Sequence, residues 1–111
     1  MSGLDDGTGV VVALVTCPDE ATALSIARAL VEERLAACVN VGGPIRSVYR
    51  WRGTVEEADE RLLVLKARAD RLGALAERLA ELHPYDVPEL LAFPVASGLG
   101  PYLDWVRAEG G

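Results

Sequence analysis

The chain has 111 residues, of which 50% are hydrophobic and 5% aromatic, and its formal net charge is −6. This length fits one domain with a modest core, and the acidic balance disfavours nonspecific binding to nucleic acid or to an anionic membrane. Two cysteines and one histidine are too few for a four-ligand Cys/His metal cage within one chain.

The chain begins with small and polar residues. Residues 1–8 read MSGLDDGT, which predicts a flexible leader ahead of a single domain at 9–111. The leader has neither the basic region nor the apolar core of a signal peptide, and no apolar run in the sequence is long enough to span a membrane. We therefore expect a cytoplasmic protein without a membrane partner.

The next part of the sequence predicts a strand, a helix and a second strand. GVVVALVT at 9–16 is a continuous apolar run, typical of a strand buried on both faces. Asp19 or its neighbour is placed to cap a helix, and apolar residues recur with helical spacing over 20–35. AACVNV at 36–41 is a short buried strand, and the Gly-Gly-Pro at 42–44 indicates a bend or bulge after it.

Residues 44–68 predict a long hairpin of two strands joined at the sequence RGT. Its first strand alternates aromatic and basic side chains, and its second strand begins acidic and ends apolar. A turn centred on Gly53 and Thr54 places Arg50 opposite Glu57, which would form an opposite-charge cross-strand pair.

The outer part of this hairpin carries aromatic and acidic side chains that a chain of 111 residues cannot cover. A two-stranded ribbon is marginal alone, and its unpaired edges favour pairing with another chain. The pattern therefore predicts an oligomer. Tyr49 and Trp51 are either interface anchors or walls of a pocket, and we favour the interface because aromatic residues dominate contact energetics.

The rest of the sequence predicts a helix, a loop, a strand and a terminal helix. Asp70 is placed to cap the helix, which ends at the His-Pro pair at 83–84. A second proline makes 85–89 a loop. LLAFPV at 90–95 is a final strand whose proline favours a sheet edge, and a short helix follows at 101–109.

The predicted order of elements is βαββαβ with an additional helix at the end. This order indicates an α+β fold of the ferredoxin-like, split βαβ type. We expect an antiparallel sheet with two helices on one face, a long protruding hairpin and a C-terminal helix.

Two cysteines have different sequence settings. Cys17 lies where the first strand meets the first helix, and a helix N-terminus stabilises a thiolate, which is a good nucleophile and metal ligand. The alternative is a small buried hydrophobic side chain. Cys38 lies within an apolar strand and is interpreted as structural.

Two further residues have both a structural and a functional interpretation. His83 either caps its helix or belongs to a binding site with the polar residues of the proline-stiffened loop that follows. Lys66 either extends to the surface along an apolar strand end or presents a cation to a cleft. The sequence has no Walker A or GxGxxG motif and no Ser/His/Asp set, so we do not expect an enzyme.

Four stretches together resemble the CutA divalent-cation tolerance proteins: VTCPDEATALSIARALVEERLAACVNV, PIRSVYRWRGTVEEADERLLVLK, HPYDVPELLAFPV and GLGPYLDWV. The resemblance extends from about Val10 to Arg107. It implies a ferredoxin-like fold related to the P-II signalling proteins, a homotrimer whose hairpins pair between subunits, and an association with copper and other divalent metals. It implies an inter-subunit cleft near seven motif positions: Cys17, Trp51, Glu60, Lys66, His83, Tyr85 and Glu89.

Three functions are compatible with these observations. The favoured one is a trimeric metal-responsive protein that binds copper or other heavy-metal ions weakly, through Cys17, His83 and Glu89, with no obligatory cofactor. In the second, a P-II-like sensor binds a small anionic ligand with Lys66 and nearby arginines as counter-charges. In the third, the oligomer is a scaffold for a protein partner. RNA binding is disfavoured by the charge and by the lack of paired sheet aromatics.

Overall fold

The computed structural model describes residues 7–111, so most of the predicted leader at 1–8 lies outside the described residues. At its end, the Thr8 hydroxyl donates a hydrogen bond to the Val95 carbonyl oxygen (2.8 Å), and Arg107 donates one to the Thr8 carbonyl oxygen (2.6 Å). The elements in chain order are β1 (Val10–Cys17), α1 (Glu20–Glu32), β2 (Cys38–Trp51), β3 (Thr54–Arg68), a 3-10 turn (Ala69–Arg71), α2 (Leu72–Leu82), β4 (Leu91–Pro94) and α3 (Gly100–Glu109).

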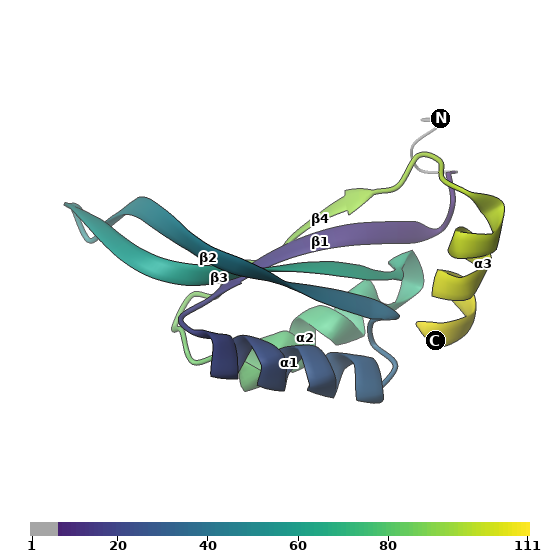
Figure 1. Ribbon diagram of the computed structural model, residues 1–111, viewed down its shortest axis with the longest axis horizontal. Coiled ribbons are helices and arrows are strands. Elements are labelled where there is room, and N and C mark those ends of the chain that lie inside the picture. The colour runs from purple at the N-terminus through teal and green to yellow at the C-terminus, as the bar shows by residue number, and fades with distance from the viewer. Residues whose placement is uncertain (1–6) are drawn as a thin grey trace.

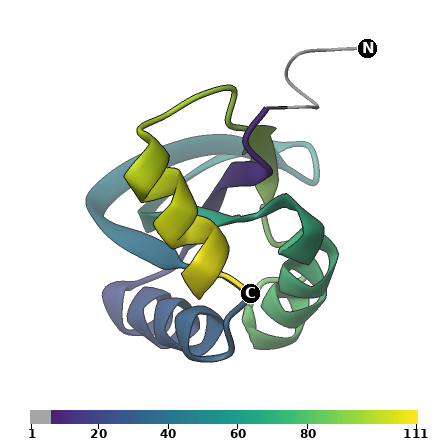
Figure 2. The same ribbon diagram turned by 90° about the vertical axis from the view of Figure 1, so that its right-hand side faces the viewer.

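The strands form one four-stranded sheet in the order β2-β3-β1-β4, and each neighbouring pair is antiparallel. Helices α1 and α2 lie side by side beneath one face of the sheet, and α3 lies at the end away from the hairpin tip (Figure 1, Figure 2). The ferredoxin-like split βαβ fold is thus confirmed, with the proline-containing β4 at a sheet edge. Among the described residues, no helix is long and apolar enough to cross a membrane.

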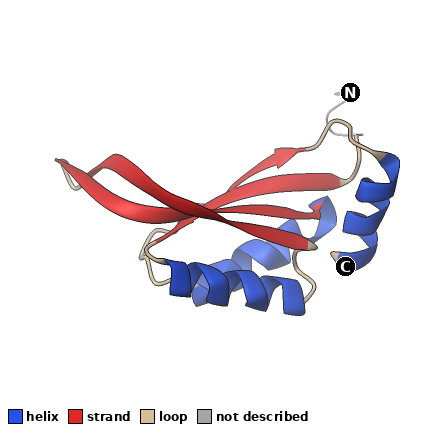
Figure 3. Cartoon of the chain, in the orientation of Figure 1, coloured by secondary structure: helices blue, strands red, loops and turns tan. Residues whose placement is uncertain are grey.

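Strands β2 and β3 form a long hairpin whose outer part extends beyond both helices (Figure 3). Trp51 pairs with Thr54, so the turn has two central residues, Arg52 and Gly53. Their φ angles are 51° and 81°, the left-handed values that a type I′ turn requires and that glycine adopts without steric cost. The register shifts at the Gly-Gly-Pro sequence of β2, which confirms the predicted bulge.

The predicted pairing of Arg50 with Glu57 is wrong, because the turn lies one residue earlier than the sequence suggested. Arg50 lies opposite Val55 instead. Arg46 provides the ion pairs on this face, with N–O distances of 3.2 Å to Glu57 and 2.9 Å to Asp59. A cross-strand charge ladder therefore exists, but it lies closer to the body of the molecule than predicted.

Local side-chain contacts define the helix ends. The carboxylate of Asp19 accepts a backbone N–H from the first turn of α1 (2.7 Å), so the predicted N-cap is confirmed. Helix α1 ends earlier than predicted, because Arg34 adopts a left-handed φ of 60°. The predicted cap by Asp70 is wrong: its carboxylate accepts two hydrogen bonds from Arg68 (2.9 and 2.6 Å), and α2 begins without a side-chain cap.

The core lies between the sheet and the two helices. Alternate residues of the central strands point toward the helices and are fully buried, among them Val15, Leu63 and Leu65. They pack against apolar residues that recur with helical spacing in α1 and α2: Ile26, Leu30, Leu75 and Leu79.

The opposite face of the sheet, which we call the helix-free face because neither α1 nor α2 covers it, also carries apolar side chains, and α3 packs only against its Val10 end. Its members share one side of the sheet by their pairing register: Val12, Leu14, Val64, Leu91 and Phe93. Leu91 is 54% exposed and Phe93 is 50% exposed. Strand β1, which the sequence predicted to be buried on both faces, is therefore fully buried on the side of α1 and α2. On its other side only Val10 is fully buried, where it packs against Leu103 and Val106 of α3.

Candidate functional site

A cleft of about 570 Å³ lies between the outer part of the hairpin and the loop that follows α2. Three aromatic side chains line it: Tyr49, Trp51 and Tyr85. Four carboxylate side chains line it as well: Glu56, Glu60, Asp86 and Glu89. In the described part of the chain no lysine, arginine or histidine lines this cleft, so its lining is both aromatic and acidic.

Strand alternation explains why these side chains meet. Tyr49 pairs with Glu56 across the hairpin, and residues two or four apart on one strand share its face. Glu56 and Glu60 are therefore on the same side of β3, and Val64 of the helix-free face shares that side. The cleft is thus a continuation of the helix-free face toward the hairpin tip.

Glu60 is the most buried carboxylate of the cleft, with 8% of its surface exposed. The Tyr85 hydroxyl donates a 2.6 Å hydrogen bond to Glu60 Oε2. Burial, and then this bond, raise the pKa of Tyr85, so the phenol remains a donor at neutral pH. Among residues 7–111, no arginine, lysine or histidine makes an ion pair with Glu60.

His83 follows α2 as its C-cap residue, and it is only 7% exposed. The Tyr85 backbone N–H donates to His83 Nδ1 (3.2 Å), and Nε2 lies 2.8 Å from the Thr16 carbonyl oxygen. A backbone N–H can only donate and a carbonyl oxygen can only accept, so Nδ1 is the acceptor and Nε2 carries the proton. Both ring nitrogens therefore have partners within the chain.

Cys17 is fully buried at the end of β1, with its Sγ 3.8 Å from His83 Nε2. Burial raises the pKa of its thiol to about 11, and the nearby charges of Glu60 and Asp19 act in the same direction. This setting agrees with the alternative interpretation of Cys17 as a small buried side chain, because the raised pKa keeps its thiol neutral at physiological pH. Cys38 is partly exposed, and both cysteines are free.

The structure brings together two of the three predicted metal ligands. Cys17 and His83 are in contact, whereas Glu89 belongs to the lining of the cleft. Within residues 7–111, no three Cys, His, Asp or Glu side chains converge closely enough to hold a metal ion. A single chain therefore provides a Cys–His pair and an acidic cleft, but not a complete coordination shell.

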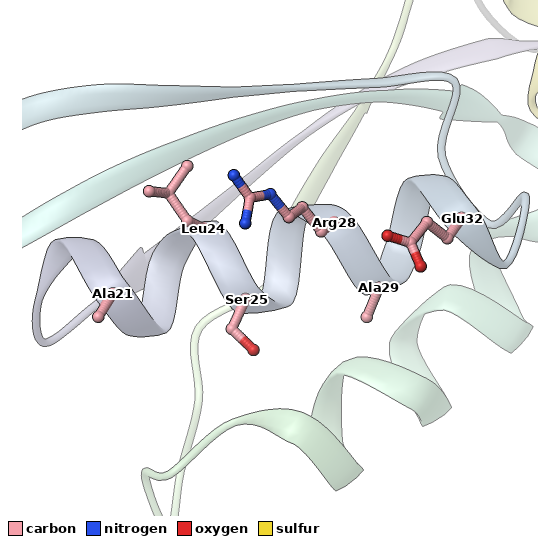
Figure 4. A pocket seen from close by; sticks show the side chains of 6 residues that line it. All are labelled: Ala21, Leu24, Ser25, Arg28, Ala29 and Glu32. Carbon is pink, nitrogen blue, oxygen red and sulfur yellow. The ribbon is translucent and has the colours of Figure 1, made fainter.

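A second hollow, of about 490 Å³, follows the outer surface of α1. All six of its lining side chains come from this one helix, among them Leu24, Arg28 and Glu32 (Figure 4). A surface formed by one helix has no opposing wall that would enclose a ligand. It carries one cation and one carboxylate, so the cleft beside the hairpin is the better candidate site.

The family model for the CutA1 divalent ion tolerance protein matches residues 11–109, nearly all of the described chain. The chain belongs to the CutA family. The divalent-cation tolerance protein CutA of Thermus thermophilus is 51% identical over 100 residues, which cover 90% of this chain and 97% of that protein. Human protein CutA is 47% identical over 108 residues, covering 93% of this chain and 60% of the human protein.

A solved CutA structure has the same fold. The crystal structure of CutA from Xylella fastidiosa superposes with a TM-score of 0.90 at 43% sequence identity. The superposition covers 93% of this chain and 99% of that one. The match extends over the hairpin and the three helices, so the whole described architecture is that of the CutA family.

Lys66, which the resemblance placed near an inter-subunit cleft, lies away from this cleft within one chain. It is paired with Val12 and Cys38 on the helix-free face, and its Nζ donates a hydrogen bond to Asn40 Oδ1. About 20 Å of extended strand separates it from Glu60. Within one chain, Lys66 therefore does not provide a counter-charge for a ligand in this cleft.

The sequence interpretation missed the apolar helix-free face. It named Tyr49 and Trp51 as interface anchors, and these are 40% and 38% exposed. It did not name Leu91 or Phe93, which are more exposed. The sequence did contain an indication of this face. The first strand has the apolar composition of a strand buried on both faces, but in the predicted fold the two helices cover only one face of the sheet, so another contact must cover the other face.

Proposed function

We propose that this CutA-family protein is a homotrimeric divalent-cation tolerance protein that binds copper and other heavy-metal ions weakly in its acidic clefts. One observation carries the proposal: the cleft presents four carboxylates and, among the described residues, no basic side chain. A lining of this charge attracts cations and repels anions. It also disfavours the alternative of a P-II-like sensor for a small anionic ligand.

The homotrimer is supported by surfaces that the chain does not cover itself. The helix-free face is apolar, and the hairpin extends beyond the helices with Val48 and Val55 64% and 59% exposed. Exposed apolar surface on the sheet and on the hairpin supports an interaction surface at both places. Because the cleft continues the helix-free face, a neighbouring subunit on that face borders the cleft. This geometry supports clefts between subunits.

The donor chemistry supports weak binding. The Cys17–His83 pair suits a soft cation such as copper. To serve as ligands, the thiol must lose a proton whose pKa is about 11, and Nε2 must give up its hydrogen bond to Thr16. Both costs reduce the net affinity. Carboxylates of the cleft, such as Glu89, would then add oxygen ligands.

No observation favours catalysis or a scaffold role, so we propose a cytoplasmic binding protein without enzymatic activity. The neutral thiol of Cys17 is a poor nucleophile at physiological pH, in agreement with this proposal. Metal binding would link the protein to the response to metal ions.

Calorimetric titration with Cu(I), Cu(II) and Mg(II) tests the metal proposal. Copper should bind with modest affinity and more tightly than magnesium, and Cys17→Ser, His83→Ala and Glu89→Gln should each weaken it. Because binding displaces the Cys17 proton, the affinity should rise about tenfold per pH unit across the neutral range. Glu77→Gln, an exposed carboxylate on α2, is the matched control and should bind copper as the parent does. Parent-like copper binding by all three cleft and Cys–His variants would contradict the proposal.

A further inference from the structure

The cleft is much larger than one metal ion requires. Its volume of about 570 Å³ lies within the range of about 300–1,000 Å³ typical of organic ligand sites. Among the described residues, no three metal-binding side chains converge in it or elsewhere. The cleft therefore has the size of a small-molecule site and the charge of a cation site.

The walls of the cleft add a second property. Tyr49, Trp51 and Tyr85 present aromatic surface, and aromatic faces attract organic cations. The guanidinium carbon of Arg52 already lies 5.4 Å from the centre of the Trp51 ring, so one such contact exists at the rim. A bare metal ion makes no use of apolar walls, whereas an alkyl ammonium packs its methylene groups against them.

Glu60 provides the third observation. It is 92% buried, yet only one of its oxygens has a hydrogen-bond partner, the neutral hydroxyl of Tyr85. Carboxylates that are largely buried in proteins are usually paired with a cation. In the described part of the chain no basic side chain fills that role, and the carboxylate borders the open cleft. A cationic ligand would supply the missing partner.

The spacing of the carboxylates selects among cations. Glu56 and Glu60 lie on one face of β3, about 13 Å apart along the strand. One ammonium group cannot contact both carboxylates. An extended aliphatic chain with an amine at each end can, with the end near Glu56 packed against Tyr49, which is paired with Glu56 across the hairpin. Asp86 and Glu89 line the facing loop and add to the negative potential.

From this geometry we propose that the cleft binds a small aliphatic polyamine, with one ammonium group on Glu60 and another near Glu56. The inference uses the same cleft as the proposed function, but it requires neither a metal ion nor the Cys17–His83 pair. It identifies the ligand class by length, charge and apolar character together.

Intrinsic fluorescence isolates the cleft. The chain has two tryptophans, so the Trp105→Phe variant leaves Trp51 as the only one. Spermidine and 1,4-diaminobutane, titrated into this variant in metal-free buffer, should change the Trp51 emission with saturation. Spermidine should bind more tightly, because it spans the two carboxylates. The neutral 1,4-butanediol should produce no saturable change.

Substitutions on the Trp105→Phe variant test the assigned contacts. Glu60→Gln keeps the shape and the Tyr85 contact but removes the charge, and should weaken spermidine binding about tenfold or more. Tyr49→Leu removes an aromatic face and should weaken it about 3-fold to 30-fold. Glu77→Gln makes the same charge change outside the cleft and should leave binding unchanged.

The two proposals fail separately. Copper binding without saturable spermidine binding would overturn the polyamine inference and leave the metal function standing. Spermidine binding that Glu60→Gln weakens, without copper binding, would support the inference and overturn the copper proposal. Spermidine binding that is equal in the Glu60→Gln and Glu77→Gln proteins would show only nonspecific attraction to an acidic surface and would overturn the inference.

Discussion

The two faces of the sheet are built from the same kinds of side chain but are covered differently. On the helix side, Val15, Leu63 and Leu65 are fully buried beneath α1 and α2. On the helix-free face, Leu91 and Phe93 keep half of their surface exposed. The apolar composition of the central strands therefore exceeds what the helices of one chain can cover.

This difference indicates that the sequence meets two separate requirements, the folding of one chain and the assembly of several copies. Residues on the helix side stabilise the fold of a single chain, because their burial needs only intrachain contacts. Residues on the helix-free face, like the outer hairpin, contribute their full burial only when another copy covers them. Substitutions on the two faces should therefore affect two different measurements, the folding of the chain and its assembly.

The largest effect is expected for Phe93→Glu on the helix-free face. In a trimer this change buries an unpaired carboxylate, which costs about 3–5 kcal/mol. We expect light scattering to show monomers at micromolar concentration, with a circular dichroism spectrum that still shows the folded chain. The matched control is Leu24→Glu on α1, where the leucine is 37% exposed and the trimer should persist.

Leu65→Ala tests the opposite face. Truncating this fully buried side chain should lower the free energy of unfolding by about 2–5 kcal/mol in urea titrations. This substitution and its control should both be introduced into the Phe93→Glu protein, so that assembly does not contribute to the measured free energy of unfolding. There, Val64→Ala, the neighbouring position on the helix-free face, should cost clearly less. Equal costs at the two positions would contradict the division between the faces.

We predict that the protein loses stability at alkaline pH because of Cys17, the buried last residue of β1. Burial raises the pKa of its thiol from 9.0 to about 11, so the unfolded chain loses this proton first as the pH rises. The free energy of unfolding should be unaffected below pH 9 and should fall by about 2–3 kcal/mol between pH 9 and pH 11. Urea titrations should show that Cys17→Ala lacks this part of the decline, whereas Cys38→Ala retains it.

The smallest effect is expected in the outer hairpin. Arg46 makes exposed ion pairs with Glu57 and Asp59, and solvent screens such pairs strongly. Arg46→Ala should lower the melting temperature less than either substitution in the sheet, and 1 M salt should reduce the difference further. A loss as large as that of Leu65→Ala would show that the ladder stabilises more than its exposure suggests.

The sequence was sufficient to predict the order of elements, because apolar periodicity and the proline and glycine positions act locally. The hairpin register was not predictable at that level. A turn centred one residue earlier changes every cross-strand pair, and the left-handed conformation of Arg52 has no sequence signal comparable to a glycine. Asp70 had the right residue type for a cap, but Arg68 competes for its carboxylate.

The candidate site was predicted only in part, because the contacts within it depend on tertiary packing rather than on local sequence patterns. Individual residues such as Glu60 and Tyr85 were identified through the family resemblance, but their hydrogen bond depends on how the loop packs against the hairpin. The state of Cys17 followed from burial, and a position in the sequence does not reveal desolvation. Likewise, the position of Lys66 on the helix-free face required the sheet register.

Sedimentation equilibrium of the unmodified protein at micromolar concentration tests most directly whether other copies cover the helix-free face. A homotrimer has a mass of about 35 kDa, three times the 11.8 kDa of one chain. We predict this mass across a tenfold range of concentration, and the Phe93→Glu protein should sediment as a single chain. A mass of 11.8 kDa for the unmodified protein would show that the exposed apolar face is not an interface between copies.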